Sequence, residues 1–250
     1  MTDETADERW QRLSQDRVDR PLPKRFYTTV SVGEDRAILL DGRAVKTPMM
    51  RPLILPNSRL AEAVAAEWQA QDKLINPPLM PLTKLANTAL DRAGPERGFV
   101  AGEVERFAAN DMTYYRAESP DSLVKLHDAH WNPVLTWAEA ALRTRFATTH
   151  AIQHVAQGPE VAAAMTSYVG RLDAFTLTAA HNLTTLTGSA LLALMLVADA
   201  ITAEAAWVAA HVDEDFQIRQ WGEDFEAARR KQNRRVDFDA TVTFLQLLQA

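Results

Sequence analysis

The chain of 250 residues has no cysteine and only 9 glycines. Without thiols it cannot form a disulfide framework, a thiolate metal site, an iron–sulfur cluster or a cysteine nucleophile. The scattered glycines form neither a Gly-x-x-x-x-Gly-Lys-Ser/Thr phosphate loop nor the Gly-x-Gly-x-x-Gly motif of dinucleotide-binding folds. No Gly-x-Ser-x-Gly nucleophile elbow occurs either. These absences argue against an enzyme, and we expect no catalytic residue, no metal and no cofactor.

The chain also lacks an excess of positive charge and any long hydrophobic run. Its 27 basic and 33 acidic residues give a net charge of −6, whereas nucleic-acid-binding domains are usually basic. The longest apolar run, residues 190–198, is far shorter than the roughly 20 residues of a membrane-spanning helix. Residues 1–8 are mostly polar and acidic, unlike a secretory signal or a transit peptide. We therefore predict a cytoplasmic protein that neither binds nucleic acid nor inserts into a membrane.

The segment from Arg25 to Pro56 has the features of a small antiparallel sheet. It is rich in aromatic and β-branched residues, and Asp41-Gly42 separates two extended runs. Asp-Gly is a strong hairpin signal because a type I′ turn needs positive φ at both central positions. The predicted strands are residues 26–32, 37–40, 43–47 and 53–55.

Beyond Pro56 the apolar residues recur with helical spacing. Asn57 or Ser58 can cap the first helix, Thr83 the second, and Pro159 suits the start of a later one. The prolines between residues 74 and 81 exclude a helix there. Further helices are predicted over residues 99–112, 123–127, 131–146, 174–186, 189–198, 202–230 and 237–248, with a break at Asn132-Pro133.

This order of elements predicts an α+β protein with a small antiparallel β-containing N-terminal domain and an all-helical C-terminal domain. Gly94-Pro95 is the best candidate for the boundary. We therefore predict a charged N-terminal tail (1–24), a β-rich domain with helices (25–94) and a helical domain (95–250). The sequence shows no heptad seam for self-association, so a monomer is expected.

Histidines are the most tempting groups for chemistry. His127 and His130 are three residues apart, and His150 and His154 are four apart, as in a helical metal pair. A catalytic metal also needs a third ligand, and a carboxylate such as Asp111 is one candidate. Pairs of histidines often arise by chance, so surface or hydrogen-bonded histidines are the simpler interpretation. A metal-assisted hydrolase stays open as an alternative, and metal analysis of the purified protein would test it.

Charged runs gather in the predicted helix from Thr202. Residues 213–215 are acidic and predict either an exposed face or a recognition patch. Residues 229–231 and 234–235 are basic and lie near the predicted end of this helix, where its dipole favours cations. Among the tryptophans, helical apolar neighbours favour the core for Trp68 and Trp137. Trp131 and Trp221 lie beside polar stretches and fit either a core or an interface.

Several strings, taken in order, resemble the ATP synthase assembly chaperone family, whose mitochondrial member is F1-ATPase assembly factor two. Each motif is weak alone, and their shared order from about residue 25 to 224 is what makes the resemblance specific. The strings are Arg25-Phe26-Tyr27, Asp41-Gly42-Arg43-x-Val45-Lys46-Thr47-Pro48, Glu67-Trp68-x-x-Gln71, Pro81-Leu82-Thr83-x-Leu85-x-Asn87-Thr88-Ala89, Asp111-x-x-x-Tyr115-Arg116, Trp131-x-Pro133-x-x-x-Trp137 and Glu214-Asp215-Phe216-Gln217-Ile218-x-x-Trp221-Gly222.

The resemblance implies a non-enzymatic chaperone with a small β domain and an orthogonal helical bundle. It also implies a client, the unassembled α subunit of the synthase's catalytic head, which the chaperone protects until the subunit pairs with β. The C-terminal string combines acidic groups for partner choice with an aromatic anchor. The expected partner-binding residues are Glu214, Asp215, Gln217, Trp221 and Gly222. A general adaptor bundle without subunit preference is a further alternative, which a broad client list after co-purification would favour.

Overall fold

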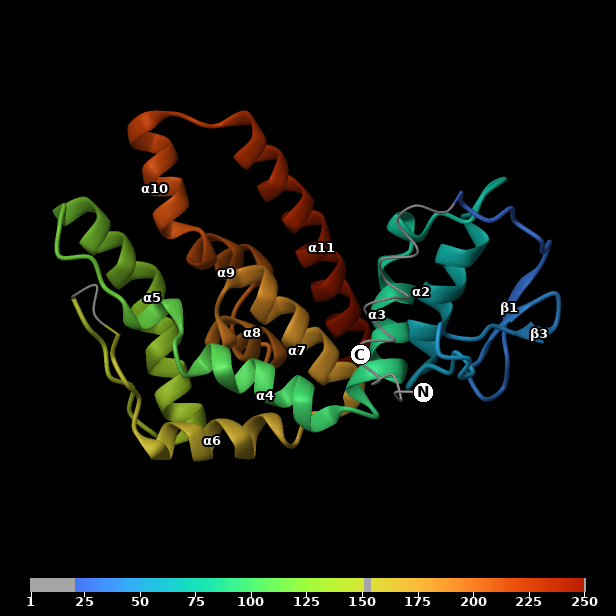
Figure 1. Cartoon of the computed structure of the whole chain (residues 1–250), viewed down its shortest axis with the longest axis horizontal. Helices are drawn as coiled ribbons and strands as arrows, with labels where there is room; N and C mark the ends of the chain where they lie inside the picture. Colours follow the sequence, from blue (N-terminus) through green and yellow to red (C-terminus); the bar gives the residue numbers. More distant parts are fainter. Residues whose placement is uncertain (1–20, 151–153, 250) are drawn as a thin grey trace, which may run out of the picture. The chain divides into compact units, whose positions relative to one another are not determined.

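The computed structural model describes residues 21–150 and 154–249. By its internal packing the chain divides into two compact units, residues 1–87 and residues 88–250 (Figure 1). The charged tail predicted for residues 1–24 lies outside the described residues except for residues 21–24. The limits predicted for the folding domains, with a boundary at Gly94-Pro95, stay a prediction.

The first unit contains a three-stranded antiparallel sheet in the order β1-β2-β3. Leu40 pairs with Val30 on β1 and with Arg43 on β3. Asp41 and Gly42 both have positive φ, 48° and 76°, so the predicted two-residue hairpin turn is confirmed. The strand predicted at residues 53–55 is reduced to isolated bridges, because the prolines on either side of it limit regular pairing. The strands are β1 (Val30–Val32), β2 (Ile38–Leu40) and β3 (Arg43–Ala44).

Helix α2 (Ser58–Gln69) packs on this sheet. Asn57 is its N-cap, because the Asn57 side chain accepts a hydrogen bond from the Leu60 amide at 2.9 Å. Leu60 and Val64 are fully buried, as their spacing predicted. Trp68 is only half-buried, and its backbone carbonyl accepts a hydrogen bond from the Tyr27 hydroxyl at 2.6 Å.

The cap of the next helix differs from the predicted one. Helix α3 (Pro81–Thr88) begins before Thr83, and the Glu67 carboxylate accepts hydrogen bonds from the Leu82 and Thr83 amides, each at 2.7 Å. Burial raises the pKa of Glu67, while these hydrogen bonds oppose that rise. The preceding prolines form a short 3₁₀ turn, η1 (Pro77–Leu79), although no helix was expected there.

The second unit is helical and is built around α7 and α8 (Figure 1). Helix α8 is almost entirely buried, and this explains why its sequence is an uncharged hydrophobic run that is apolar on all sides of the helix. The predicted α+β class is therefore confirmed. The elements are η2 (Ala89–Ala93), α4 (Arg97–Ala108), η3 (Met112–Tyr114), α5 (Asp121–Leu142), α6 (Pro159–Val169), α7 (Ala174–Thr187), α8 (Ala190–Val197), α9 (Ala203–Ala210), α10 (Val212–Trp221) and α11 (Phe225–Gln249).

Two predicted helix boundaries are wrong. Helix α5 continues through Pro133, because Trp131, Val134 and Ala138 bury one continuous face on both sides of the proline. That packing outweighs the backbone hydrogen bond that proline removes. The long helix predicted over residues 202–230 is instead α9, α10 and the first part of α11. Gly222, with φ of +88°, ends α10.

Among the described residues, no helix is both long enough and apolar enough to cross a membrane.

Candidate partner-binding site

Helix α10 carries all five residues predicted to bind a partner, four within it and Gly222 at its C-terminal cap. The acidic run from Asp213 to Asp215 occupies its first turn, not the middle of a longer helix. Carboxylates there are favoured by the partial positive charge of the helix N-terminus, by about 0.3–1 kcal/mol each when exposed. Val212 and Phe216 are the only residues of α10 that are buried, so most of the helix faces solvent.

Asp213 ties α10 to α5 through a buried histidine. Its Oδ1 lies 2.7 Å from Nε2 of His127, while Nδ1 of His127 lies 3.1 Å from the Ala117 amide. Because an amide N–H only donates, Nδ1 must accept, and the ring therefore carries its proton on Nε2 and donates it to Asp213. His127 also stacks on Trp131 with 3.8 Å between ring centroids. The Trp131 indole donates to the Ala209 carbonyl at 2.8 Å, which fixes this corner of the unit.

Glu214 and Asp215 share one cation from α11. The ammonium of Lys231 forms an ion pair with Asp215, and it lies 3.8 Å from Oε2 of Glu214. The Lys231 side chain is only 18% exposed, whereas both carboxylates remain nearly half exposed. The acidic pair therefore braces α10 against α11 and still presents oxygens to the surface.

His211 lies beneath this pair at the junction of α9 and α10. Its Nδ1 donates to the Trp207 carbonyl at 2.8 Å, so Nε2 bears the lone pair. That nitrogen is buried without a hydrogen-bond partner among the described residues, and it lies 3.9 Å from Oε2 of Glu214. Burial lowers the pKa of His211, and the positive charges of Lys231 and Arg234 lower it further. The hydrogen bond to the Trp207 carbonyl and the nearby Glu214 carboxylate oppose this lowering of the pKa. The neutral His211 side chain thus lies buried at the junction of α9 and α10, beneath the carboxylate of Glu214.

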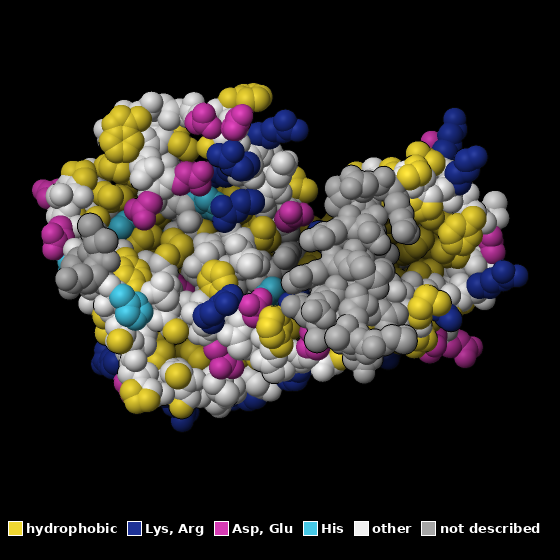
Figure 2. Space-filling model, viewed as in Figure 1, with side chains coloured by type: hydrophobic (Ala, Val, Ile, Leu, Met, Phe, Trp, Pro, Cys, Tyr) yellow, Lys and Arg dark blue, Asp and Glu magenta, His cyan; other side chains and the backbone are white. Residues whose placement is uncertain are grey.

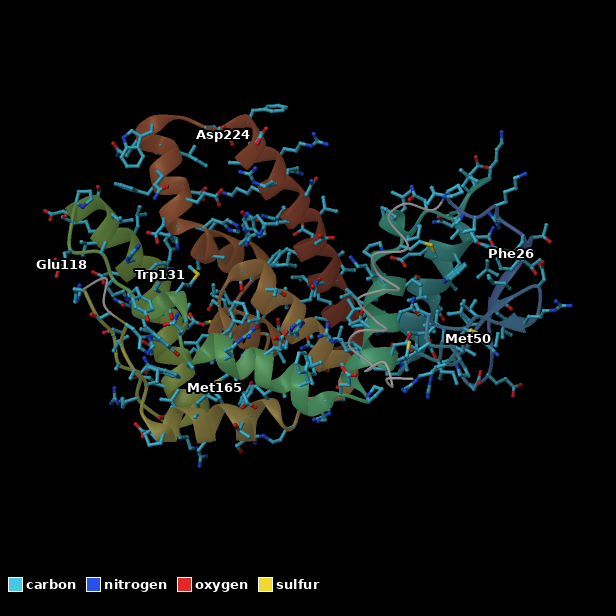
Figure 3. All side chains as sticks on the ribbon, viewed as in Figure 1. Phe26, Met50, Glu118, Trp131, Met165 and Asp224 are labelled. Carbon is cyan, nitrogen blue, oxygen red and sulfur yellow. The ribbon has the colours of Figure 1, made fainter. Side chains whose placement is uncertain are left out.

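The far end of α10 leads into an exposed loop. Trp221 is 80% exposed and Phe225, the first residue of α11, is 82% exposed. Between them, Asp224 caps α11 by accepting a hydrogen bond from the Ala227 amide at 2.8 Å. Figure 3 labels Asp224 in this loop, well separated from Trp131, which lies within the helical unit. Two large apolar side chains, four positions apart in the sequence, are therefore exposed to solvent at the two ends of this loop.

The structure resolves the two ambiguous tryptophans in opposite ways. Trp131 is 1% exposed and belongs to the core, whereas Trp221 lies at the surface. Gln217 is exposed on the same helix, and Gly222 follows Trp221 with a backbone that disfavours other residues. Sequence reasoning missed Phe225 and Lys231. Gly222 could have indicated the break that exposes Phe225, whereas nothing in the sequence points to the pairing of Lys231.

The basic run of residues 229–235 lies in the first half of α11, so the predicted helix-end explanation is wrong. Arg234 donates to the Leu186 carbonyl, and Arg235 forms ion pairs with Glu204 at 2.8 Å and Asp239 at 2.9 Å. These two arginines hold α11 to the rest of the unit.

The geometry gives no support to a metal-assisted hydrolase. Asp111 is fully buried and accepts hydrogen bonds from Ser189 Oγ at 2.8 Å and the Leu191 amide at 3.1 Å, which caps α8. His127 is instead engaged with Asp213, and His130 is half-buried. Within residues 21–150 and 154–249, no three histidine or carboxylate side chains are close enough to hold a metal ion.

The other histidine pair, His150 and His154, spans residues 151–153, which lie outside the described part of the chain. His154 is hydrogen-bonded to Asn110 at 3.1 Å, so its ring already has a protein partner.

Comparisons with known proteins agree on one family. The model of the ATP12 chaperone protein family matches residues 24–139. Atp12 from Paracoccus denitrificans is 37% identical, with a TM-score of 0.85 over 90% of this chain and 98% of that one. An aspartate-to-lysine variant of the same protein is 36% identical, with a TM-score of 0.86 over 90% of this chain and 97% of that chain. The Atu1473 protein of Agrobacterium tumefaciens, described as a proposed chaperone, is 39% identical, with a TM-score of 0.85 over 94% and 90% of the two chains.

Proposed function

The chain belongs to the ATP12 chaperone family, and from that premise we propose that it binds the unassembled α subunit of the ATP synthase catalytic head. The family consists of ATP synthase assembly chaperones, which are not enzymes. We propose that this chain works in the cytoplasm as a monomer and protects the α subunit until it pairs with β.

The physical requirement for such a chaperone is simple. An unassembled subunit exposes apolar surface that is meant for its permanent partner, and such surface promotes aggregation. A chaperone must cover it and later release it, so its own contact should combine a few apolar anchors with polar groups. Electrostatic complementarity then contributes mainly to specificity and association rate.

The exposed Trp221 is the observation that carries the proposed site. Tryptophan is enriched among the residues that dominate binding energy. This one sits at the end of a helix whose other end is fixed by the His127–Asp213 hydrogen bond and the Lys231–Asp215 ion pair. Glu214 and Asp215 lie on the same helix with half-exposed carboxylates. We propose that Trp221 is the apolar anchor, that Gln217 and Gly222 border it, and that the two carboxylates select a basic region of the α subunit.

The test is the affinity of three variants, Glu214→Lys, Asp215→Lys and Trp221→Ala, for purified α subunit. Each should weaken binding by about tenfold or more, since hot-spot residues contribute about 2 kcal/mol or more. Glu62→Lys, an exposed carboxylate on α2, is the matched charge control and should bind like the wild type. Because Glu214 and Asp215 also contact Lys231, each variant must first show an unchanged circular dichroism spectrum. Folded variants with wild-type affinity would mean that the client binds elsewhere.

A further inference from the structure

Helix α11 is buried along only half of its length. Its second half is anchored to the helical unit by buried side chains, Phe238, Thr241, Val242, Phe244 and Leu245. Its first half, residues 225–237, contains no buried residue. In Figure 1 this half rises beside α10 to the loop that joins the two helices. A helix segment without a buried face usually needs another source of stability or a partner.

The first half of α11 is nevertheless held in place as a helix. Asp224 caps it, and Glu226 and Arg230 lie one turn apart with 3.7 Å between their charged atoms. Lys231 pairs with Asp215 on α10, and Arg235 pairs with Asp239. The segment is therefore preorganised, and binding to it costs less conformational entropy than ordering a flexible loop.

One stripe of this helix combines apolar and basic side chains. Phe225, Arg229, Gln232 and Val236 follow each other at spacings of four, three and four, which places them on one face over about 16 Å. Phe225 is 82% and Val236 58% exposed. Arg229 forms no ion pair with any residue in the described ranges. Figure 2 shows basic side chains beside apolar ones at the end of the helical unit where α10 and α11 meet.

We propose that this stripe is a second docking surface for the client, and that it fits an apolar pocket edged by carboxylates on the client subunit. The proposal rests on the client assigned above. Charge complementarity supports it, because Arg229 is a cation with no counterion in the described part of the chain and lies between two exposed apolar side chains. Continuity supports it as well, since only three residues separate Phe225 from Trp221. Aromatic and arginine side chains are the types that most often dominate interface energy.

A second copy of the chain fits this surface less well than an acidic client. A two-fold interface presents the same patch from both subunits. It would bring Arg229 and Arg230 of one copy close to those of the other, and like charges oppose each other across an interface. Glu226, one turn away on the same helix, is already close to Arg230.

The experiment measures the affinity of purified α subunit for the full-length chain and for Phe225→Ala, Arg229→Glu and Arg229→Gln, at two salt concentrations. Phe225→Ala and Arg229→Glu should bind about tenfold more weakly or worse. Arg229→Gln should lose less affinity and should show a smaller dependence on salt, because one screened ion pair is gone. Both positions are exposed, and each replacement is a good helix former, so the fold should be retained.

Matched controls are Phe26→Ala, whose phenylalanine is 73% exposed in the first unit, and Arg59→Glu on α2. Both should bind the α subunit like the wild type. If Trp221→Ala weakens binding while all three α11 variants match the wild type, this inference is wrong and the proposed function stands. If the wild type itself does not bind the α subunit, both are wrong. A concentration-dependent dimer that Phe225→Ala abolishes, with client binding unchanged, would also overturn the inference in favour of a second copy.

Discussion

Two tryptophans with similar polar neighbours in the sequence have opposite environments in the fold. Trp131 is buried against His127 and donates to the Ala209 carbonyl. Trp221 has no comparable enclosure and is 80% exposed. Residue type and spacing did not distinguish them, because helix α10 ends where the sequence pattern predicted continuation. Their contrast separates a residue needed for folding from one available for binding.

Replacing each tryptophan by alanine should expose that contrast. Trp131→Ala should lower the free energy of unfolding by about 3–5 kcal/mol, because it removes a fully buried aromatic side chain and leaves a cavity. Trp221→Ala should change it by less than about 0.5 kcal/mol, as expected for an exposed position. Urea unfolding followed by circular dichroism measures both values. A large loss of stability in Trp221→Ala would show that the indole is part of the packing.

His211 should make the stability of the fold sensitive to acid. Burial holds its pKa below the ordinary value of 6.5, so the unfolded chain binds a proton at this site before the folded chain does. The stabilisation is therefore complete above about pH 6.5 and decreases as the pH falls below that value, down to the lowered pKa.

His211→Phe keeps an aromatic ring against Trp207 and removes the titrating group. It loses the hydrogen bond to the Trp207 carbonyl, so it should be less stable at neutral pH and should lose less stability between pH 7 and 5 than the wild type. His150→Phe, at an exposed site, should retain the wild-type pH dependence. Urea midpoints measured across this range provide the comparison. Identical slopes for His211→Phe and the wild type would contradict the account.

At the scale of elements, helices α10 and α11 are joined by a three-residue loop and by the Lys231 ion pairs. Glu214 and Asp215 could therefore have two roles, holding α10 against α11 and contacting a client. A single charge reversal, Asp215→Lys or Lys231→Asp, should cost about 1 kcal/mol of stability, because the groups are partly solvated.

The double reversal, Asp215→Lys with Lys231→Asp, distinguishes the structural role of Asp215 from a role in client binding. It should restore most of the lost stability because the opposite charges again face each other, although Glu214 then meets an aspartate. If Asp215 contacts the client directly, affinity for the α subunit should stay low in this stable double variant. Full recovery of both stability and affinity would assign Asp215 a bracing role only. Thermal unfolding and a binding titration on the same samples give both readouts.

Local signals predicted the elements that depend on neighbouring residues. The Asp41-Gly42 turn, the Asn57 cap and the start of a helix at Pro159 all follow from backbone preferences of short segments. Local sequence signals failed where residues distant in the sequence determine a helix cap or a helix boundary. Glu67 caps α3 from another helix, and packing around Trp131 carries α5 through Pro133.

The candidate site was predictable only in part for the same reason. The acidic run and Trp221 could be named from their residue types and from the family resemblance. The partners of these groups could not, because His127 lies 86 and Lys231 16 residues away from the carboxylates they bind. Gly222, with its positive φ, was a usable signal for the loop that exposes Phe225.

At the scale of the whole molecule, the chain is a folded scaffold that presents one preorganised helical hairpin to solvent. Its buried carboxylates and histidines are engaged in capping and bracing, as Asp111 and His127 illustrate. Among the described residues, its two most exposed aromatic side chains, Trp221 and Phe225, lie where α10 and α11 meet. This distribution suits a protein that recognises another protein and releases it unchanged.

The central claim is that the client is the unassembled α subunit, held until β replaces the chaperone. The most direct measurement immobilises the full-length chain, adds purified α subunit, and then adds β subunit as competitor. If the client is the α subunit, α is retained alone and β displaces it as αβ pairs form. Failure to retain α, or retention of many unrelated unfolded proteins at equal strength, would contradict it.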